Sequence, residues 1–138
     1  TFKRSTSNVS GFWGGVYFYP ENISEPVNFD TELSQLGHDI SGAMTEINTI
    51  DPEGGVILAS VIDGRLESGR ITFIKRYING AEKHDVTYQG TVSDDFMEIS
   101  GQWSILSLSG TFVMSRDGGK RIEPPAKRAQ VGNKEFVQ

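Results

Sequence analysis

A few aromatic and ionic side chains recur along the chain at positions where β-strands would direct them to a common side. Tyrosine and tryptophan rings stack on flat ligands, and their polar tips also make hydrogen bonds. A carboxylate and a guanidinium add the ability to orient a polar group. We therefore expect non-enzymatic binding of a small, partly aromatic or amphipathic ligand at a site lined by Tyr17, Tyr19, Glu46, Arg76, Tyr88 and Trp103.

Signals for catalysis or metal binding are weak. His38 and His84 each precede an aspartate, but adjacent strand residues point to opposite faces and do not form a dyad. The chain has no cysteine, which excludes thiol nucleophiles, thiolate metal sites and disulfides. The acidic pairs at 51–53 and 94–95 are typical of turns rather than of a calcium loop. We predict no catalytic residue, no metal ligand and no cofactor, and an enzyme ranks third among the function classes.

The composition limits the classes of partner that the chain is expected to bind. The 138 residues fit one domain, and the net charge is −5, from 13 Lys+Arg against 18 Asp+Glu. An acidic chain lacks the basic footprint that nucleic-acid binding requires. No apolar run approaches the roughly 18 residues of a membrane span. We expect a soluble protein, with the cytoplasm slightly favoured, although a start at Thr1 leaves a removed leader open.

Glycines separate runs rich in Val, Ile, Phe, Tyr and Thr, which is the pattern of strands and turns. Residues 27–36 also fit a short amphipathic helix, but both neighbours are strands and no N-cap precedes them, so a strand is favoured. Asn79-Gly80 is a favoured hairpin dipeptide. The predicted strands are at about 9–19, 27–36, 39–48, 55–63, 69–78, 84–92, 95–104 and 107–116.

Short connections favour sequential hairpins, and therefore an all-β, eight-stranded antiparallel up-and-down barrel over a sandwich. The interior of such a barrel is just wide enough to be filled by side chains or to hold one small ligand. The barrel should occupy residues 1–116. Residues 117–138 should form a polar tail, partly disordered or packed on the surface. The tail has five basic and three acidic residues, whereas residues 1–69 have three and ten, so it could dock on an acidic face.

The first strand, within Ser10–Pro20, should direct alternate side chains to opposite faces. We place Trp13, Gly15, Tyr17 and Tyr19 inward, and Phe12, Val16 and Phe18 outward. Trp13 would plug one end of the barrel. The two tyrosines would fill the lumen or line a pocket, with Glu46 and Arg76 as hydrogen-bond partners.

Outward apolar residues raise the alternative of a protein-interaction, assembly or inhibitor-type module with a filled barrel. An outer patch of Phe12, Phe18 and Phe73 would make the contacts. The fifth predicted strand also carries apolar residues on both faces, which indicates a partner outside it. We expect a homodimer or a higher homo-oligomer.

Short motifs follow one another in a familiar order. They are Gly11-Phe12-Trp13, Ser41-Gly42, Ile74-Lys75, Tyr88-Gln89-Gly90, Gln102-Trp103 and Thr111-Phe112. Over about residues 9–116 this order resembles the streptavidin-like (avidin-type) barrels, within the wider calycin-like architecture. The resemblance implies the eight-stranded fold and a bacterial member of that group.

The resemblance does not extend to the biotin site. The family's two polar residues on the first strand are replaced by Gly15 and Tyr19, and those on the third strand by Met44 and Glu46. Ile74 and Gly110 replace a tryptophan and an aspartate, whereas the aromatic residues at Tyr88 and Trp103 are kept. Each lost polar contact to a buried ligand costs roughly 1–3 kcal/mol. A ligand other than biotin is expected.

Overall fold

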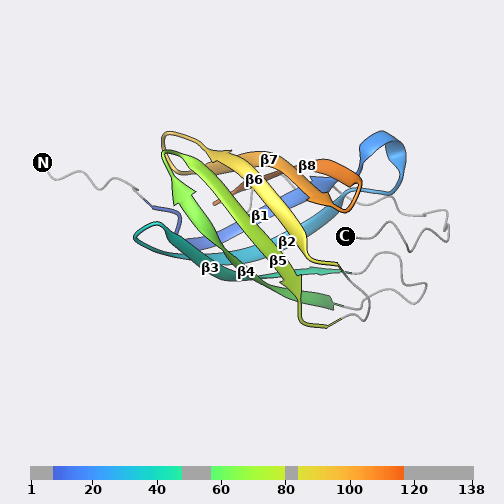
Figure 1. The fold of residues 1–138 in the computed structure, drawn as a ribbon, viewed down its shortest axis with the longest axis horizontal. Coiled ribbons are helices and arrows are strands. Elements are labelled where there is room, and N and C mark those ends of the chain that lie inside the picture. Colours follow the sequence, from blue (N-terminus) through green and yellow to red (C-terminus); the bar gives the residue numbers. More distant parts are fainter. Residues whose placement is uncertain (1–7, 48–56, 80–83, 117–138) are drawn as a thin grey trace, which may run out of the picture.

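The computed structural model describes residues 8–47, 57–79 and 84–116, which fold into one closed β-barrel (Figure 1). Each strand pairs antiparallel with the next along the chain, and β1 also pairs with β8, so the two ends of the barrel sequence lie side by side. The strands are β1 (Gly11–Phe18), β2 (Val27–Leu36), β3 (Asp39–Ile47), β4 (Ile57–Glu67), β5 (Arg70–Tyr77), β6 (Val86–Val92), β7 (Glu98–Ile105) and β8 (Leu108–Ser115), with a short 3-10 turn η1 (Pro20–Asn22) after β1.

The predicted all-β up-and-down barrel is confirmed, and residues 27–36 form a strand rather than a helix. The strand bounds differ most at β4, which continues to Glu67 instead of ending near residue 63. Ser68 and Gly69 then make a two-residue turn with φ of 53° and 78°. Positive φ at both positions matches the right-handed twist of the paired strands, so β4 and β5 remain paired up to the turn.

The predicted hairpin at 79–80 is only half visible, because Gly80 lies outside the described residues, as do 51–53 and the tail at 117–138. Asn79 is the last described residue of β5's side of this connection. Its side chain accepts a hydrogen bond from Ala59 N at 2.8 Å and donates one to Ile57 O at 3.0 Å. It thereby prolongs the β4–β5 pairing beyond the last residue of β5.

Strict alternation places one face of every strand in the lumen. In β5, Ile71, Phe73 and Lys75 are buried, while Thr72, Ile74 and Arg76 are exposed. Glycine opens space where an inward side chain would collide with a ring from the neighbouring strand. At Gly15 an added Cβ would lie 2.6 Å from the Phe29 ring, so only glycine lets that ring cross the lumen.

One end of the barrel is closed as expected by Trp13, which is 2% exposed. Its indole Nε1 donates to Val9 O at 2.9 Å. The guanidinium of Arg116, just after β8, lies 4.7 Å from the Trp13 ring centre. The same guanidinium donates to Ser10 O at 2.6 Å, to Phe96 O at 2.8 Å and to Asn8 O. This end is therefore tied together by segments from both termini of the barrel.

Candidate functional site

Glu46, near the end of β3, is the centre of a polar cluster inside the barrel. Its Oε2 accepts hydrogen bonds from Tyr17 Oη at 2.6 Å and from Tyr77 Oη at 2.9 Å. Its Oε1 accepts one from Lys75 Nζ at 3.0 Å. Buried carboxylates need such partners because their desolvation is otherwise prohibitive. Three strands, β1, β3 and β5, therefore converge on one side chain.

Lys75 is the cation of this cluster and is fully buried, at 0% exposed. Besides Glu46, its Nζ donates to Tyr88 Oη at 3.3 Å. The ammonium also lies 4.7–5.5 Å from the ring centres of Tyr17, Tyr77 and Tyr88. An ammonium held over aromatic faces gains an electrostatic attraction that grows as water is excluded. We call Tyr17, Glu46, Lys75, Tyr77 and Tyr88 the lumen cluster.

The prediction that Arg76 points into the barrel is wrong. Arg76 is exposed on the outer face of β5, and its Nε pairs with Asp85 at 3.2 Å. The inward cation is its neighbour Lys75. Because Ile71 and Phe73 are inward, the alternation of the strand puts residue 75 on the same face and residue 76 on the opposite one.

Two tyrosine hydroxyls in the lumen cluster are held in the neutral form. Burial raises the pKa of Tyr17 well above its usual value, and the neighbouring Glu46 carboxylate raises it further. The same two causes, burial first, raise the pKa of Tyr77. Both tyrosines therefore act as hydrogen-bond donors to Glu46 rather than as bases.

The other predicted site residues lie beside the cluster. Tyr19, at 8% exposed, packs edge-on against Tyr17 and Trp103, with ring centres 5.7 and 5.3 Å apart. The indole Nε1 of Trp103 donates to Phe18 O at 3.1 Å. Five of the six predicted residues thus gather in one half of the lumen, and Arg76 does not. Sequence reasoning missed Lys75 and Tyr77. Both point to the same face of β5 as Phe73, because they follow it by two and four residues.

Side chains fill this half of the lumen over the described residues. Trp103 and Tyr88 are 0% exposed. Tyr88 stacks on Phe73 at 4.8 Å and meets Phe112 edge-on at 4.9 Å. A cavity of roughly 300 Å³ or more is typical of a ligand site. A hollow of about 330 Å³ does exist, but it is lined mainly by outward residues of β1–β3, such as Phe12, Asp30 and Glu32.

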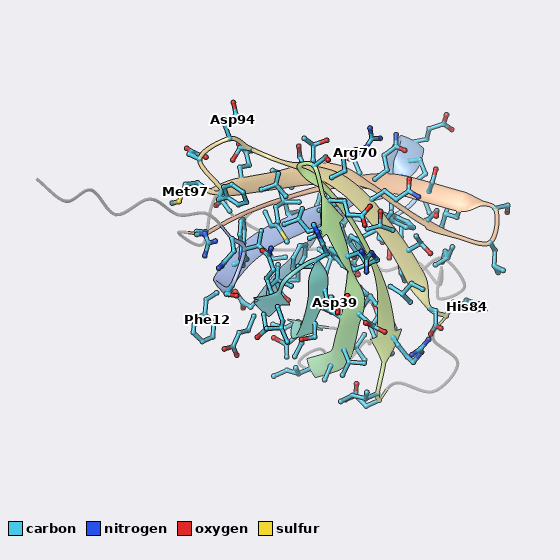
Figure 2. The ribbon with its side chains drawn as sticks, turned by 60° about the vertical axis from the view of Figure 1, so that its left-hand side comes forward. Phe12, Asp39, Arg70, His84, Asp94 and Met97 are labelled. Carbon is cyan, nitrogen blue, oxygen red and sulfur yellow. The ribbon has the colours of Figure 1, made fainter. Side chains whose placement is uncertain are left out.

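Within the described ranges, no three acidic or histidine side chains come close enough to hold a metal ion. His38 lies in the β2–β3 turn, where its Nδ1 is 2.9 Å from Leu66 O. His84 is exposed ahead of β6 and lies at the barrel surface (Figure 2). In the same part of the chain, no helix is long and apolar enough to cross a membrane.

The outer surface differs from the expected patch. Phe12 projects from β1 and is 71% exposed (Figure 2), and Phe18 is partly exposed. Phe73, however, is 1% exposed inside the barrel, so its outward placement was wrong. The larger apolar surface lies on β3–β5, where five aliphatic residues are 39–65% exposed. We call it the aliphatic face; it consists of Ile47, Ile57, Val61, Ile74 and Ile78.

No protein-family model matches the chain, and no curated protein matches it.

Proposed function

We propose that this barrel is a non-enzymatic assembly module that self-associates through the aliphatic face. The observation that carries the proposal is the contrast between a lumen packed with side chains and an outer face that leaves several aliphatic residues in water. Monomeric proteins rarely leave a contiguous apolar patch uncovered unless it serves as an interaction site.

The aliphatic face is continuous because its residues are neighbours in register. Ile47 pairs with Ile57 across β3 and β4, and Ala43 pairs with Val61. On the other side, Ile78 N donates to Ala59 O at 2.9 Å, which places Ile78 beside β4. A closed barrel has no free strand edge to offer a partner, so association has to use a face of this kind.

Charge favours a second copy as the occupant. Arg76 pairs in register with Val61, and Asp63 pairs with Ile74. One positive and one negative side chain therefore flank the apolar centre on different strands. A twofold axis through the centre would bring the arginine of one copy towards the aspartate of the other, as an isologous interface requires.

The test is the mass in solution of the full chain and of Val61→Glu/Ile74→Glu, by sedimentation equilibrium over a wide concentration range. Two buried carboxylates at an interface are costly to desolvate, so the variant should be monomeric where the natural chain is a dimer. Leu36→Glu/Leu106→Glu is the matched control, because both leucines are more than 80% exposed and lie outside the face. A natural chain that stays monomeric throughout would overturn the proposal.

A second candidate is binding of a small, partly aromatic or amphipathic ligand, and the lumen cluster favours it. Replacing a buried ion pair by apolar side chains is often neutral or stabilising. A polar centre in the lumen is therefore more than packing requires. Among the tyrosines of the lumen cluster and the neighbouring Tyr19 and Trp103, the rings of Tyr19 and Tyr77 are the least buried. The ligand would rest on these two rings. Native mass spectrometry of the purified chain, followed by denaturation, would reveal a released small molecule, and Tyr19→Ala should reduce the loaded fraction.

We also propose that the barrel is streptavidin-like. The Gly-x-Trp strand and the Gln-Trp strand occupy β1 and β7, where the resemblance requires them. Met44 and Gly110 replace polar biotin contacts, and Ile74, which replaces an aromatic one, is exposed on the outer face of β5, so biotin is not the proposed ligand.

A further inference from the structure

The outer face of β1 is shielded from water, and the side chains beside it on β2 and β8 do not explain this shielding. Val16 points outward as predicted, but it is only 2% exposed. Its outward neighbours in register are Asn28 on β2 and Val113 on β8, which are not large. By comparison, the outward Val61 on β4 is 39% exposed. Val16 is therefore shielded more completely than its two neighbours in register explain.

An acidic strip lies directly beside this covered strand. Asp30 and Glu32 are exposed and outward on β2, and they form part of the rim of the 330 Å³ hollow, with Phe12 on its β1 side. Asp30 and its outward neighbour Asn28 each take part in an interaction. The strip combines two carboxylates with apolar walls, and so suits a basic segment that also carries apolar side chains.

We propose that the C-terminal segment 117–138 docks on this face, crossing β1 and pairing Lys120 and Arg121 with the carboxylates of Asp30 and Glu32. The segment carries five basic and three acidic residues, together with scattered apolar residues. Its charge is opposite to that of the strip. Covering Val16 would remove an apolar side chain from water, which adds to the ion pairs.

The point where the chain leaves the barrel supports this docking. Ser115, the last residue of β8, pairs with Gly14 on β1, and Gly14 pairs with Asp30 on β2. Two strand spacings, about 10 Å, separate the end of β8 from Asp30. Four extended residues beyond Arg116 span up to about 14 Å. Lys120 and Arg121 can therefore reach the strip without a long excursion.

Trypsin cleavage of the folded, full-length chain tests the docking, because Lys120 and Arg121 are themselves cleavage sites. The variant Asp30→Asn/Glu32→Gln removes both charges without creating a new site. Exposed ion pairs contribute about 0.2–1 kcal/mol each, so cleavage at 120–121 should be about two- to thirtyfold faster when proteolysis follows the undocked population. Added salt should also make cleavage of the natural chain faster, because it screens the ion pairs.

Asp39→Asn/Glu67→Gln is the matched control, since both residues are exposed, pair with Arg65 on β4 and lie outside both the strip and the aliphatic face. Cleavage that is equally fast in the strip variant, the control and the natural chain would overturn the proposal. Carbodiimide coupling of mixed heavy- and light-isotope chains then identifies the occupant. A Lys120 link to Asp30 or Glu32 within one chain supports the proposal. A link only between chains would mean that the segment docks on a second copy, and would overturn it.

Discussion

Lys75 and Glu46 face each other across the lumen from β5 and β3, with the lysine Nζ 3.0 Å from Oε1 of the glutamate. Their side chains are 0% and 2% exposed. Neither charge has access to bulk water, so each depends on the other and on the surrounding tyrosines. The pair therefore connects β3 to β5, the two strands on either side of β4.

Lys75→Met should therefore destabilise the barrel strongly. It leaves the Glu46 carboxylate buried without its cation, and loss of one partner of a buried ion pair costs about 3–5 kcal/mol. The free energy of unfolding in urea measures this loss. Arg76→Met, one residue along but on the outer face, removes only the exposed pair with Asp85 and should cost less than about 1 kcal/mol.

Adding Glu46→Gln to Lys75→Met distinguishes a charge effect from a packing effect. The amide still accepts hydrogen bonds from Tyr17 and Tyr77 but no longer leaves a buried charge. The double variant should be more stable than Lys75→Met alone. If the losses of unfolding free energy in Lys75→Met and in Glu46→Gln simply add up in the double variant, the two side chains are not coupled.

The tyrosines of the lumen cluster predict a loss of stability at alkaline pH. Burial and Glu46 raise the folded-state pKa of Tyr17 and Tyr77 above the ordinary value of 10.0. Above about pH 10 the unfolded chain releases these protons while the folded chain retains them. Their contribution is complete below pH 10 and declines as pH rises towards the folded-state pKa.

Two such groups steepen the fall in unfolding free energy by about 2.7 kcal/mol per pH unit, well above pH 10. Urea unfolding of the natural chain and of Tyr17→Phe/Tyr77→Phe, repeated across this range, measures the slope. In the double variant the slope should be smaller by the contribution of these two protons, about 2.7 kcal/mol per pH unit. Equal slopes would mean that the two phenols ionise in the folded barrel.

The strands could be predicted from sequence because alternation, glycine and short connections agree along the whole barrel. The same alternation places Tyr17, Glu46 and Tyr88 correctly. It failed at residues 75 and 76, where two cations stand side by side. A one-residue error in parity exchanges inside and outside, and the same error placed Arg76 in the lumen and Phe73 on the outer face. Only the three tyrosine rings and Glu46, brought together by the fold, show why a lysine is accommodated.

Phe73 and Val16 illustrate two other limits. Phe73 was placed outside because strand five is apolar on both faces, so hydrophobicity alone could not assign its parity. Val16 was assigned to the correct face, but its 2% exposure depends on cover that alternation within a strand does not encode.

Arg116 provides the last prediction, at the end of the barrel closed by Trp13. Its guanidinium lies over the indole, 4.7 Å from the ring centre, and also donates to three backbone carbonyls. Hydrogen bonds from a charged group contribute about 1.5–3 kcal/mol, so Arg116→Met should lower the unfolding free energy by at least about 2 kcal/mol and alter the tryptophan fluorescence. Arg116→Lys should recover only part of the loss, because an ammonium cannot stack flat and reach several carbonyls at once. Full recovery by lysine would show that charge alone matters, and that the planar contact with Trp13 does not close this end.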